Sequence, residues 1–329
     1  MNASSIAALL TALCATLGAA PLAPPARVLH TTFDTDRVYV TVRTRNGATL
    51  DLYTDTGGGM LLSADAARRA GLEAHAVTDS ATVAQLGPGA AVADAPRLAP
   101  DEPAPAFPVG QQIAVVPAVA EVPGWPAQGD GIVGQAWFAG HVWTWDYPGH
   151  RLVLRPAGWR PSDTRHALAV GFKHAGGHRV LDFPRIVVRV DGDSLSMLLD
   201  TGAETMLSAG ALAALHDGRP AFRATSMIAH AVFARWHAAH PDWPVVDSAQ
   251  AVTHSRMIRV PRVEIAGLAT GPVWFTERSD ASYRQYMSAM TDREVEGSLG
   301  GNALADFRMT LDYPRARAWF TCVRDCRPA

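Results

Sequence analysis

The chain carries the stretch LLDTGAETML at residues 198–207 and a related stretch, LYTDTGGGML, at residues 52–61. In each, an apolar run ends in Asp-Thr-Gly, which is typical of a strand followed by a sharp turn. Glycine permits the turn, and the threonine hydroxyl can bond to neighbouring backbone. The carboxylates of Asp55 and Asp200 are therefore held where they can take part in chemistry.

The residues around both turns repeat as well. Asn46-Gly47 and Asp191-Gly192 each precede the Asp by 9 residues, so the two copies share an offset of 200 − 55 = 145. Both dipeptides indicate a two-residue hairpin. Ser63 and Ser208 stand where a helix N-cap is preferred. The pattern predicts strands at 38–43, 49–53, 186–190 and 194–199, and short helices at 64–70 and 209–215.

A second repeated block closes each half of the chain. DGIVG at residues 130–134 leads to Asp-Tyr-Pro at 146–148, and EGSLG at 296–300 leads to the same tripeptide at 312–314. Equivalent residues of this block are 166 apart. The chain is therefore a duplication of one unit, with about twenty extra residues in the second copy.

This duplication predicts two lobes, at residues 28–156 and 168–323, joined by a linker at 157–167 and followed by a tail at 324–329. With 329 residues, of which 48% are hydrophobic, the chain can bury one large core or two small ones. The formal net charge of −2 gives no electrostatic case for nucleic acid or for an acidic membrane surface as a partner.

Residues 1–25 are small and apolar, and Gly18-Ala19-Ala20 offers a small-residue cleavage site. They predict a signal peptide, and hence an exported protein that is periplasmic or secreted. An uncleaved N-terminal anchor is the alternative, because residues 1–5 contain no Lys or Arg. No other stretch is long enough to cross a bilayer, so no further membrane contact is expected.

Three cysteines are present, and Cys14 belongs to that leader. The remaining pair, Cys322 and Cys326, predicts one local disulfide in an exported chain. A helix is predicted at residues 228–236, ending before Pro241. The nearby His237, His240 and Asp242 do not form a His-Glu-x-x-His motif, so neither a metal nor a cofactor is expected.

Residues 83–98 contain many turn formers around Gly87-Pro88-Gly89. They predict either a mobile hairpin with its tip at these three residues or a surface loop rich in Pro and Ala. In the first case Gln85, Leu86 and Gly87 are candidates for contact with a bound molecule. The second case assigns them no role.

Together these features resemble the bilobal aspartic peptidases, and particularly their retropepsin-like bacterial relatives. The resemblance rests on both Asp-Thr-Gly turns and on Ala203-Glu204-Thr205 after the second. It also rests on two hydrophobic-Gly segments, Ile132-Val133-Gly134 and, less perfectly, Ser298-Leu299-Gly300. It covers both lobes.

The resemblance implies an all-β fold of two similar six-stranded-type β-barrel lobes related by a pseudo-two-fold axis, with short helices. It implies that Asp55 and Asp200 form a catalytic pair, and that each hydrophobic-Gly segment crosses behind the turn of its own lobe. The residues implied to support the pair are Thr56, Gly57, Thr201 and Gly202.

The implied activity is that of an endopeptidase acting on a peptide or protein substrate. One chain carries both carboxylates, so a monomer suffices. Two carboxylates a few ångströms apart cannot both ionise at modest cost, so they share one proton and titrate as a pair. The ionised member can then activate a water molecule.

The sequence departs from the family at several positions. No Tyr lies between Tyr53 and Tyr147, and Ser298 replaces an apolar residue. Gly58 and Ala203, both candidates for the substrate cleft, supply no hydroxyl to the carboxylates, so we expect the pair to hold its shared proton to higher pH. The alternative function is a catalytically silent peptide-binding or interaction protein of the same fold.

Overall fold

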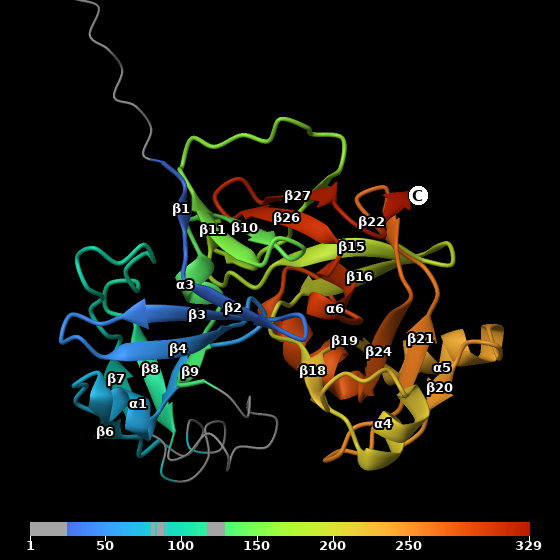
Figure 1. The fold of residues 1–329 in the computed structure, drawn as a ribbon, viewed down its shortest axis with the longest axis horizontal. Helices are drawn as coiled ribbons and strands as arrows, with labels where there is room; N and C mark the ends of the chain where they lie inside the picture. The colour runs from blue at the N-terminus through green and yellow to red at the C-terminus, as the bar shows by residue number, and fades with distance from the viewer. Residues whose placement is uncertain (1–24, 80–82, 84–88, 90, 117–128) are drawn as a thin grey trace, which may run out of the picture.

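The computed structural model describes residues 25–79, 83, 89, 91–116 and 129–329. It is an all-β structure with short helices, as predicted, and is built on three large sheets, with two small two-stranded hairpins in addition (Figure 1). Strands of the first half of the chain form one lobe and strands of the second half form the other. A third sheet, drawn in green and red, lies beside both. The predicted signal peptide lies almost wholly outside the described residues.

The first lobe contains an eight-stranded sheet in the order β2-β3-β4-β9-β5-β8-β7-β6. Its strands are β2 (Thr31–Asp34), β3 (Arg37–Arg43), β4 (Thr49–Thr54), β5 (Leu61–Ser63), β6 (His75–Ala76), β7 (Ala91–Asp94), β8 (Gln112–Val116) and β9 (Gly131–Val133). Its helices are α1 (Ala64–Arg69) and α3 (Gln135–Phe138). Helix α1 begins as predicted, because the Ser63 hydroxyl accepts a hydrogen bond from the N–H of Ala66.

The second lobe contains a ten-stranded sheet in the order β20-β21-β24-β19-β25-β16-β15-β22-β23-β28. Its strands are β15 (Arg185–Val190), β16 (Asp193–Leu199), β19 (Ser226–Ala229), β20 (Val245–Val246), β21 (Met257–Val260), β22 (Val263–Ile265), β23 (Leu268–Thr270), β24 (Val273–Arg278), β25 (Gly297–Leu299) and β28 (Arg327–Pro328). Two small hairpins are β13 (His174–Ala175) with β14 (His178–Arg179), and β17 (Glu204–Met206) with β18 (Phe222–Ala224). The helices are α4 (Ala209–Leu215), α5 (His230–Ala239), η2 (Ala281–Tyr286), η3 (Met287–Met290) and α6 (Gly301–Leu304).

The sequence did not predict the third sheet, which combines strands of both lobes in the order β1-β11-β10-β26-β27-β12. Its strands are β1 (Arg27–Val28), β10 (Val142–Asp146), β11 (Arg151–Arg155), β12 (Ala167–Ala169), β26 (Phe307–Asp312) and β27 (Arg317–Cys322). The two lobes meet where β10 pairs with β26 in antiparallel register, with Thr144 opposite Thr310. The hydroxyl oxygens of these two buried threonines are 2.7 Å apart.

Three local expectations differ from the structure. Asn46-Gly47 belongs to a longer connection, since Arg43 pairs with Thr49, whereas Asp191-Gly192 forms the expected two-residue turn with positive φ at both residues. Helix α5 begins at His230, because residues 226–229 pair as β19 with β24 and β25. Residues 324–329, expected as a tail, contribute β28, which pairs with β23.

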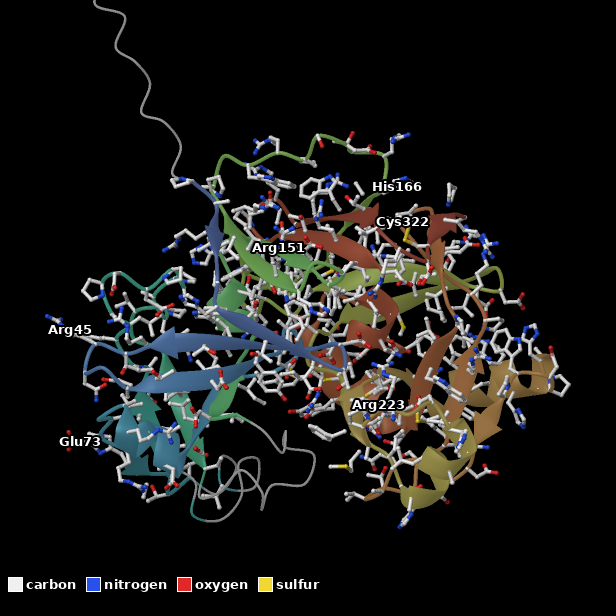
Figure 2. The ribbon with its side chains drawn as sticks, in the orientation of Figure 1. Arg45, Glu73, Arg151, His166, Arg223 and Cys322 are labelled. Carbon is white, nitrogen blue, oxygen red and sulfur yellow. A yellow bond between two sulfur atoms is a disulfide. The ribbon has the colours of Figure 1, made fainter. Side chains whose placement is uncertain are left out.

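One continuous hydrophobic core joins the lobes through the shared sheet. It includes a group of aromatic side chains in which Trp137, Trp143 and Phe138 contact one another, with ring centroids 4.8–5.3 Å apart. Side chains crowd the space between the sheets, while Arg45 and Glu73 extend from the periphery (Figure 2). This packing fixes the relative position of the two Asp-Thr-Gly turns.

Candidate active site

The two carboxyl groups lie at the ends of equivalent strands. Asp55 follows β4 and Asp200 follows β16, and each strand is buried over its last three residues. The N–H of Asp55 donates to the carbonyl of Val133 beside β4, and the N–H of Asp200 donates to that of Leu299 beside β16, both at 3.0 Å. The hydrophobic-Gly segments therefore hold the backbone of each Asp.

Gly134 and Gly300 allow these segments to pass close behind the turns. A Cβ atom at Gly134 would lie 2.2 Å from the carbonyl oxygen of Gly58, and one at Gly300 would lie 1.9 Å from that of Thr225. Both distances are far below van der Waals contact, so glycine alone fits. Within the segments, Val133 and Leu299 are fully buried, whereas Ile132 is partly exposed.

Thr56 and Thr201 join the two turns through reciprocal hydrogen bonds. The N–H of Thr56 donates to Oγ1 of Thr201 at 3.2 Å, and the N–H of Thr201 donates to Oγ1 of Thr56 at 3.0 Å. Each hydroxyl then donates across the lobes to a carbonyl, Thr56 to Leu199 at 2.6 Å and Thr201 to Thr54 at 3.1 Å. Both threonines are fully buried, so these bonds fix the turns face to face.

Gly57 and Gly202 allow the carboxyl groups to approach each other. A Cβ atom at Gly57 would lie 2.5 Å from Cγ of Asp200, and one at Gly202 would lie 2.2 Å from Cγ of Asp55. The N–H of Gly57 donates to Oδ1 of Asp55 at 2.9 Å, and that of Gly202 donates to Oδ1 of Asp200 at 3.1 Å. The structure thus brings together all six residues of the two Asp-Thr-Gly turns.

The contacts of Gly57 and Gly202 place each carboxyl group against the turn that carries the other. Burial, followed by the charge of Asp200, raises the pKa of Asp55 well above its ordinary value. Burial also raises the pKa of Asp200, although the N–H of Gly202, which donates to its carboxyl, opposes that rise. Two carboxyl groups so close together cannot both ionise at modest cost, so the pair holds one proton.

Neither Gly58 nor Ala203 supplies a hydroxyl to the carboxyl group of its own turn. At the first turn, a Cβ atom at Gly58 would lie 2.0 Å from Oδ2 of Asp55, so that oxygen occupies the space of a side chain. In the second lobe the hydroxyl of buried Ser298, from β25, lies 3.0 Å from the hydroxyl of Tyr283.

A third carboxyl lies near the pair and was not predicted as a site residue. The side chain of Glu204 is 9% exposed, and burial raises its pKa to about 8, although the charge of Arg37 opposes that rise. Nη1 of Arg37, in the first lobe, is 3.9 Å from Oε2 of Glu204, in the second. The hydroxyl of nearby Tyr53 donates to the carbonyl of Thr201 at 3.5 Å. The position of Glu204 two residues after the second Asp-Thr-Gly was its only signal in the sequence.

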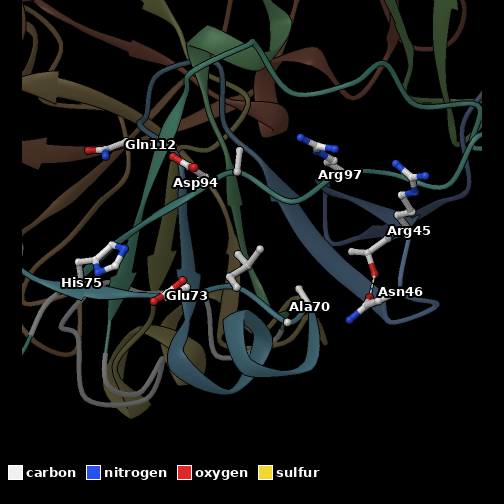
Figure 3. A pocket seen from close by; sticks show the side chains of 12 residues that line it. Arg45, Asn46, Ala70, Glu73, His75, Asp94, Arg97 and Gln112 are labelled. Carbon is white, nitrogen blue, oxygen red and sulfur yellow. Dashed lines mark hydrogen bonds between the residues drawn. The ribbon is translucent and has the colours of Figure 1, made fainter.

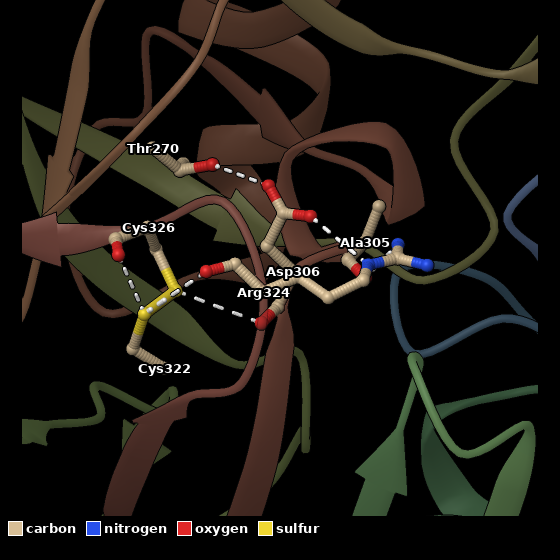
Figure 4. The surroundings of a disulfide bond; sticks show 6 residues. All are labelled: Thr270, Ala305, Asp306, Cys322, Arg324 and Cys326. Carbon is tan, nitrogen blue, oxygen red and sulfur yellow. Dashed lines mark hydrogen bonds and ion pairs between the residues drawn. A yellow bond between two sulfur atoms is a disulfide. The ribbon is translucent and has the colours of Figure 1, made fainter.

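Other candidates lie away from the pair or cannot be placed. Gln85, Leu86 and Gly87 fall outside the described residues. Cys322 and Cys326 form a disulfide with an S–S distance of 2.01 Å, beside Asp306 and Arg324 (Figure 4). The disulfide joins the last residue of β27 to the residue before β28.

Two further features are separate from the carboxyl pair. A cavity of about 690 Å³ lies in the first lobe, and Arg45, Glu73, His75 and Arg97 are among its lining residues (Figure 3). Across residues 25–79, 91–116 and 129–329, no three His, Cys, Asp or Glu side chains are grouped as metal ligands. His240 instead lies 2.6 Å from Asp191.

No helix within the described part of the chain is long and apolar enough to cross a membrane.

No protein-family model matches the chain, and no curated protein matches its sequence. Solved structures do match. An aspartic proteinase from Irpex lacteus is 13% identical over 91% of this chain and 98% of its own, with a TM-score of 0.45. Conglutin gamma, a basic 7S globulin from lupine seeds, is 13% identical over 91% of this chain and 95% of its own, with a TM-score of 0.46.

Proposed function

We propose that this protein is an aspartic endopeptidase whose catalytic groups are Asp55 and Asp200. The observation that carries the proposal is the carboxyl pair itself, which Thr56 and Thr201 hold face to face and in which burial raises the pKa of both acids. Two buried acids placed together are costly unless they perform chemistry, and perturbed pairs of this kind are typical of catalytic sites. A structural role would be served as well by apolar residues.

The chemistry follows from the one proton that Asp55 and Asp200 hold between them. The ionised member takes a proton from a water molecule, whose oxygen bonds to the carbonyl carbon of the peptide. The protonated member donates its proton to the carbonyl oxygen, so that the tetrahedral intermediate is neutral. When the C–N bond breaks, the proton taken from water passes to the leaving amine, and a hydroxyl proton of the intermediate returns to the member that donated one. The reaction consumes one water molecule and needs no covalent intermediate.

The proposal includes the setting of the enzyme. Its substrate is a peptide or protein, and it acts as a monomer because both carboxyl groups come from one chain. Its activity per milligram should therefore stay constant on dilution, whereas a steep loss would indicate a dimer. The apolar leader of residues 1–25 supports export to the periplasm or the medium.

A peptide-binding protein that does not cut is the second candidate. It is favoured by the absence of any Tyr between Tyr53 and Tyr147, the part of the first lobe where the family carries a tyrosine over the site. Such a protein would have no use for a shared proton.

The test is cleavage of a broad peptide library by the wild type, by Asp200→Asn and by the control Asp193→Asn. Asp193 lies at the other end of β16, where it forms an ion pair with exposed Arg235 at 3.0 Å. We expect cleavage by the wild type and the control, inhibition by pepstatin, and no cleavage by Asp200→Asn. Peptide binding without cleavage by the wild type would favour the second candidate.

A further inference from the structure

The sheet that the two lobes share has an apolar face and a polar face. Side chains alternate between the faces along a strand, and residues paired across strands lie on the same face. One face belongs to the hydrophobic core and carries Trp143, Trp145, Leu154, Met309, Leu311 and Phe320. The register places polar and aromatic side chains on the opposite face, namely Thr144, Arg155, Arg308, Thr310, Trp319 and Thr321.

The linker between the lobes closes a cavity over this polar face. Residues 156–166 lead from β11 to β12 (Figure 1), and Nη2 of Arg315 holds them to the second lobe by donating to the carbonyl of Ala157 at 3.1 Å. The cavity has a volume of about 350 Å³. Its lining includes Arg155 from the first lobe, Trp159, Arg160 and Asp163 from the linker, and Arg308 and Trp319 from the second lobe.

Arg155 is a half-buried cation without a counter-ion. The nearby Asp146 is paired instead with Arg151 at 2.6 Å and with Arg308 at 3.2 Å. Burial, followed by the charges of Arg308 and Arg151, lowers the pKa of Arg155, and the charge of Asp146 opposes this shift. A guanidinium nevertheless stays protonated. Among the residues that the structure describes, Arg155 forms no ion pair with a carboxylate, so a positive charge in this cavity is left uncompensated.

The free donors of Arg155 suit a carboxylate. Its Nε donates to Oγ1 of Thr144 at 2.9 Å, whereas its two Nη groups make no hydrogen bond within the described part of the chain. Arg160 uses Nη1 to donate to the carbonyl of Trp159 at 2.9 Å and likewise forms no ion pair there. A carboxylate has two oxygens in one plane, which match the two Nη groups of a guanidinium.

Two indole rings form the apolar part of the cavity. The ring centroids of Trp159 and Trp319 are 5.8 Å apart, with their planes at 72°, and both side chains are half-buried. Cζ of Arg155 lies 5.6 Å from the ring centroid of Trp159, so the cation and the indoles are neighbours. Aromatic rings stabilise one another in edge-to-face or offset arrangements. Because ligand pockets span about 300–1,000 Å³, this cavity suits a single small ring.

We propose that this cavity binds a small aromatic carboxylate, with the carboxylate on Arg155 and Arg160 and the ring against Trp159 and Trp319. The carboxylate can belong to a free acid or to the last residue of a peptide. The duplication does not account for such a site, because Thr321 and Val153 stand at the positions offset by 166 residues from Arg155 and Trp319.

The proposal goes beyond the endopeptidase, since none of these residues belongs to an Asp-Thr-Gly turn. A bound molecule would contact the first lobe, the linker and the second lobe together, so its binding should stabilise the folded chain.

The test measures binding of 3-phenylpropionate to the full chain by isothermal titration calorimetry. We expect saturable binding at one site. The amide 3-phenylpropionamide keeps the ring but has no charge, and acetate keeps the charge but has no ring. Each should bind at least about tenfold more weakly. Tighter binding of acetyl-glycyl-phenylalanine than of 3-phenylpropionate would identify a peptide C-terminus as the occupant, and weaker binding would identify a free acid.

Variants locate the bound molecule. Arg155→Gln and Arg160→Gln should each weaken binding by about tenfold, and Trp159→Leu by about fivefold. Arg160→Gln and Trp159→Leu leave the hydrogen bond of Arg155 to Thr144 in place, so they decide the matter if Arg155→Gln does not fold.

Arg165→Gln is the matched control. It removes the same charge from the same linker, but Arg165 lies outside the cavity lining and pairs with Asp163 at 2.7 Å. This variant should bind 3-phenylpropionate as the wild type does, and so should Asp200→Asn, because the carboxyl pair is a separate site.

Four results would overturn the proposal. They are no saturable binding of 3-phenylpropionate, equal binding of its amide, an equal loss in Arg165→Gln, or a loss in Asp200→Asn, which would place the molecule at the carboxyl pair. Cleavage does not enter the measurement, so this site and the proposed endopeptidase can fail separately.

Discussion

The first and second lobes hold the same Asp-Thr-Gly turn on the same arrangement of strands, but they surround its carboxyl group differently. Ser298 and Glu204 of the second lobe stand where the first lobe has Ile132 and Gly59, at offsets of 166 and 145 residues. Strand pairing thus reproduces the backbone twice, while a few side chains differ between the lobes. The predictions below test this comparison, and all but the one for Glu204 pair equivalent positions.

The largest effect is expected at the carboxyl groups. Asp55→Asn and Asp200→Asn should each lower kcat/KM by about a thousandfold or more, because each removes one partner in proton transfer. An amide at either position can neither accept nor release the shared proton, so both losses should be of the same order. Kinetics on one peptide measure both. A retained kcat/KM in either variant would contradict the assignment of the pair.

The next effect concerns stability and should be equal in the two lobes. Thr56→Val and Thr201→Val each remove a hydroxyl that makes two hydrogen bonds and leave buried backbone groups unpaired. Each should lower the free energy of unfolding by about 3 kcal/mol. Urea unfolding followed by circular dichroism measures it. Thr41→Val, at a partly exposed position of β3, is the control, and a large difference between the two turns would refute the symmetry.

A smaller effect should be confined to the second lobe and depend on pH. The folded pKa of Glu204 is raised to about 8, above the ordinary value of 4.5, so its contribution to stability is full at low pH and is lost as pH rises through about 8. Glu204→Gln should remove this dependence. Between pH 5 and pH 8, the free energy of unfolding of the variant should therefore rise by about 2 kcal/mol relative to that of the wild type.

Unfolding titrations at both pH values, with Glu264→Gln as the control, test this claim. The side chain of Glu264 is one-third exposed and pairs with Arg262. An equal response of both variants would show that burial of Glu204 is not the cause.

The smallest effect is expected at the helix caps. Ser63→Ala and Ser208→Ala each remove one hydrogen bond, to the N–H of Ala66 and of Ala211 respectively, both at 3.1 Å. Each substitution should lower the free energy of unfolding by about 1 kcal/mol. Thermal unfolding of both variants measures the loss, and a neutral result at one cap alone would mean that its helix is held by packing.

The sequence could predict what depends on local signals. Short sequence patterns predict the strands that lead to Asp55 and Asp200 and the helix caps at Ser63 and Ser208. The repeat in the sequence identifies the two Asp-Thr-Gly turns as equivalent positions. The pairing of β10 with β26 could not be predicted, because it joins residues that are 162 to 170 positions apart in the chain.

The contact of Ser298 with Tyr283 depends on how η2 packs, and that of Arg37 with Glu204 depends on how the lobes meet. Ser298 was a signal of this contact in the sequence, but it was interpreted only as a departure from the family. A serine in an otherwise apolar segment indicates a buried hydroxyl that needs a partner.

The Thr144 and Thr310 pair has a consequence for the ancestry of the chain. These residues occupy equivalent positions in the two halves, yet they face each other in the register of β10 and β26, with their hydroxyls 2.7 Å apart. In an isologous dimer, a residue on the symmetry axis meets its own copy. In a dimer of two identical half-length chains joined along this strand, the threonine of one chain would face the same threonine of the other. The present chain keeps this arrangement, because Thr144 and Thr310 still face each other where such a symmetry axis would pass.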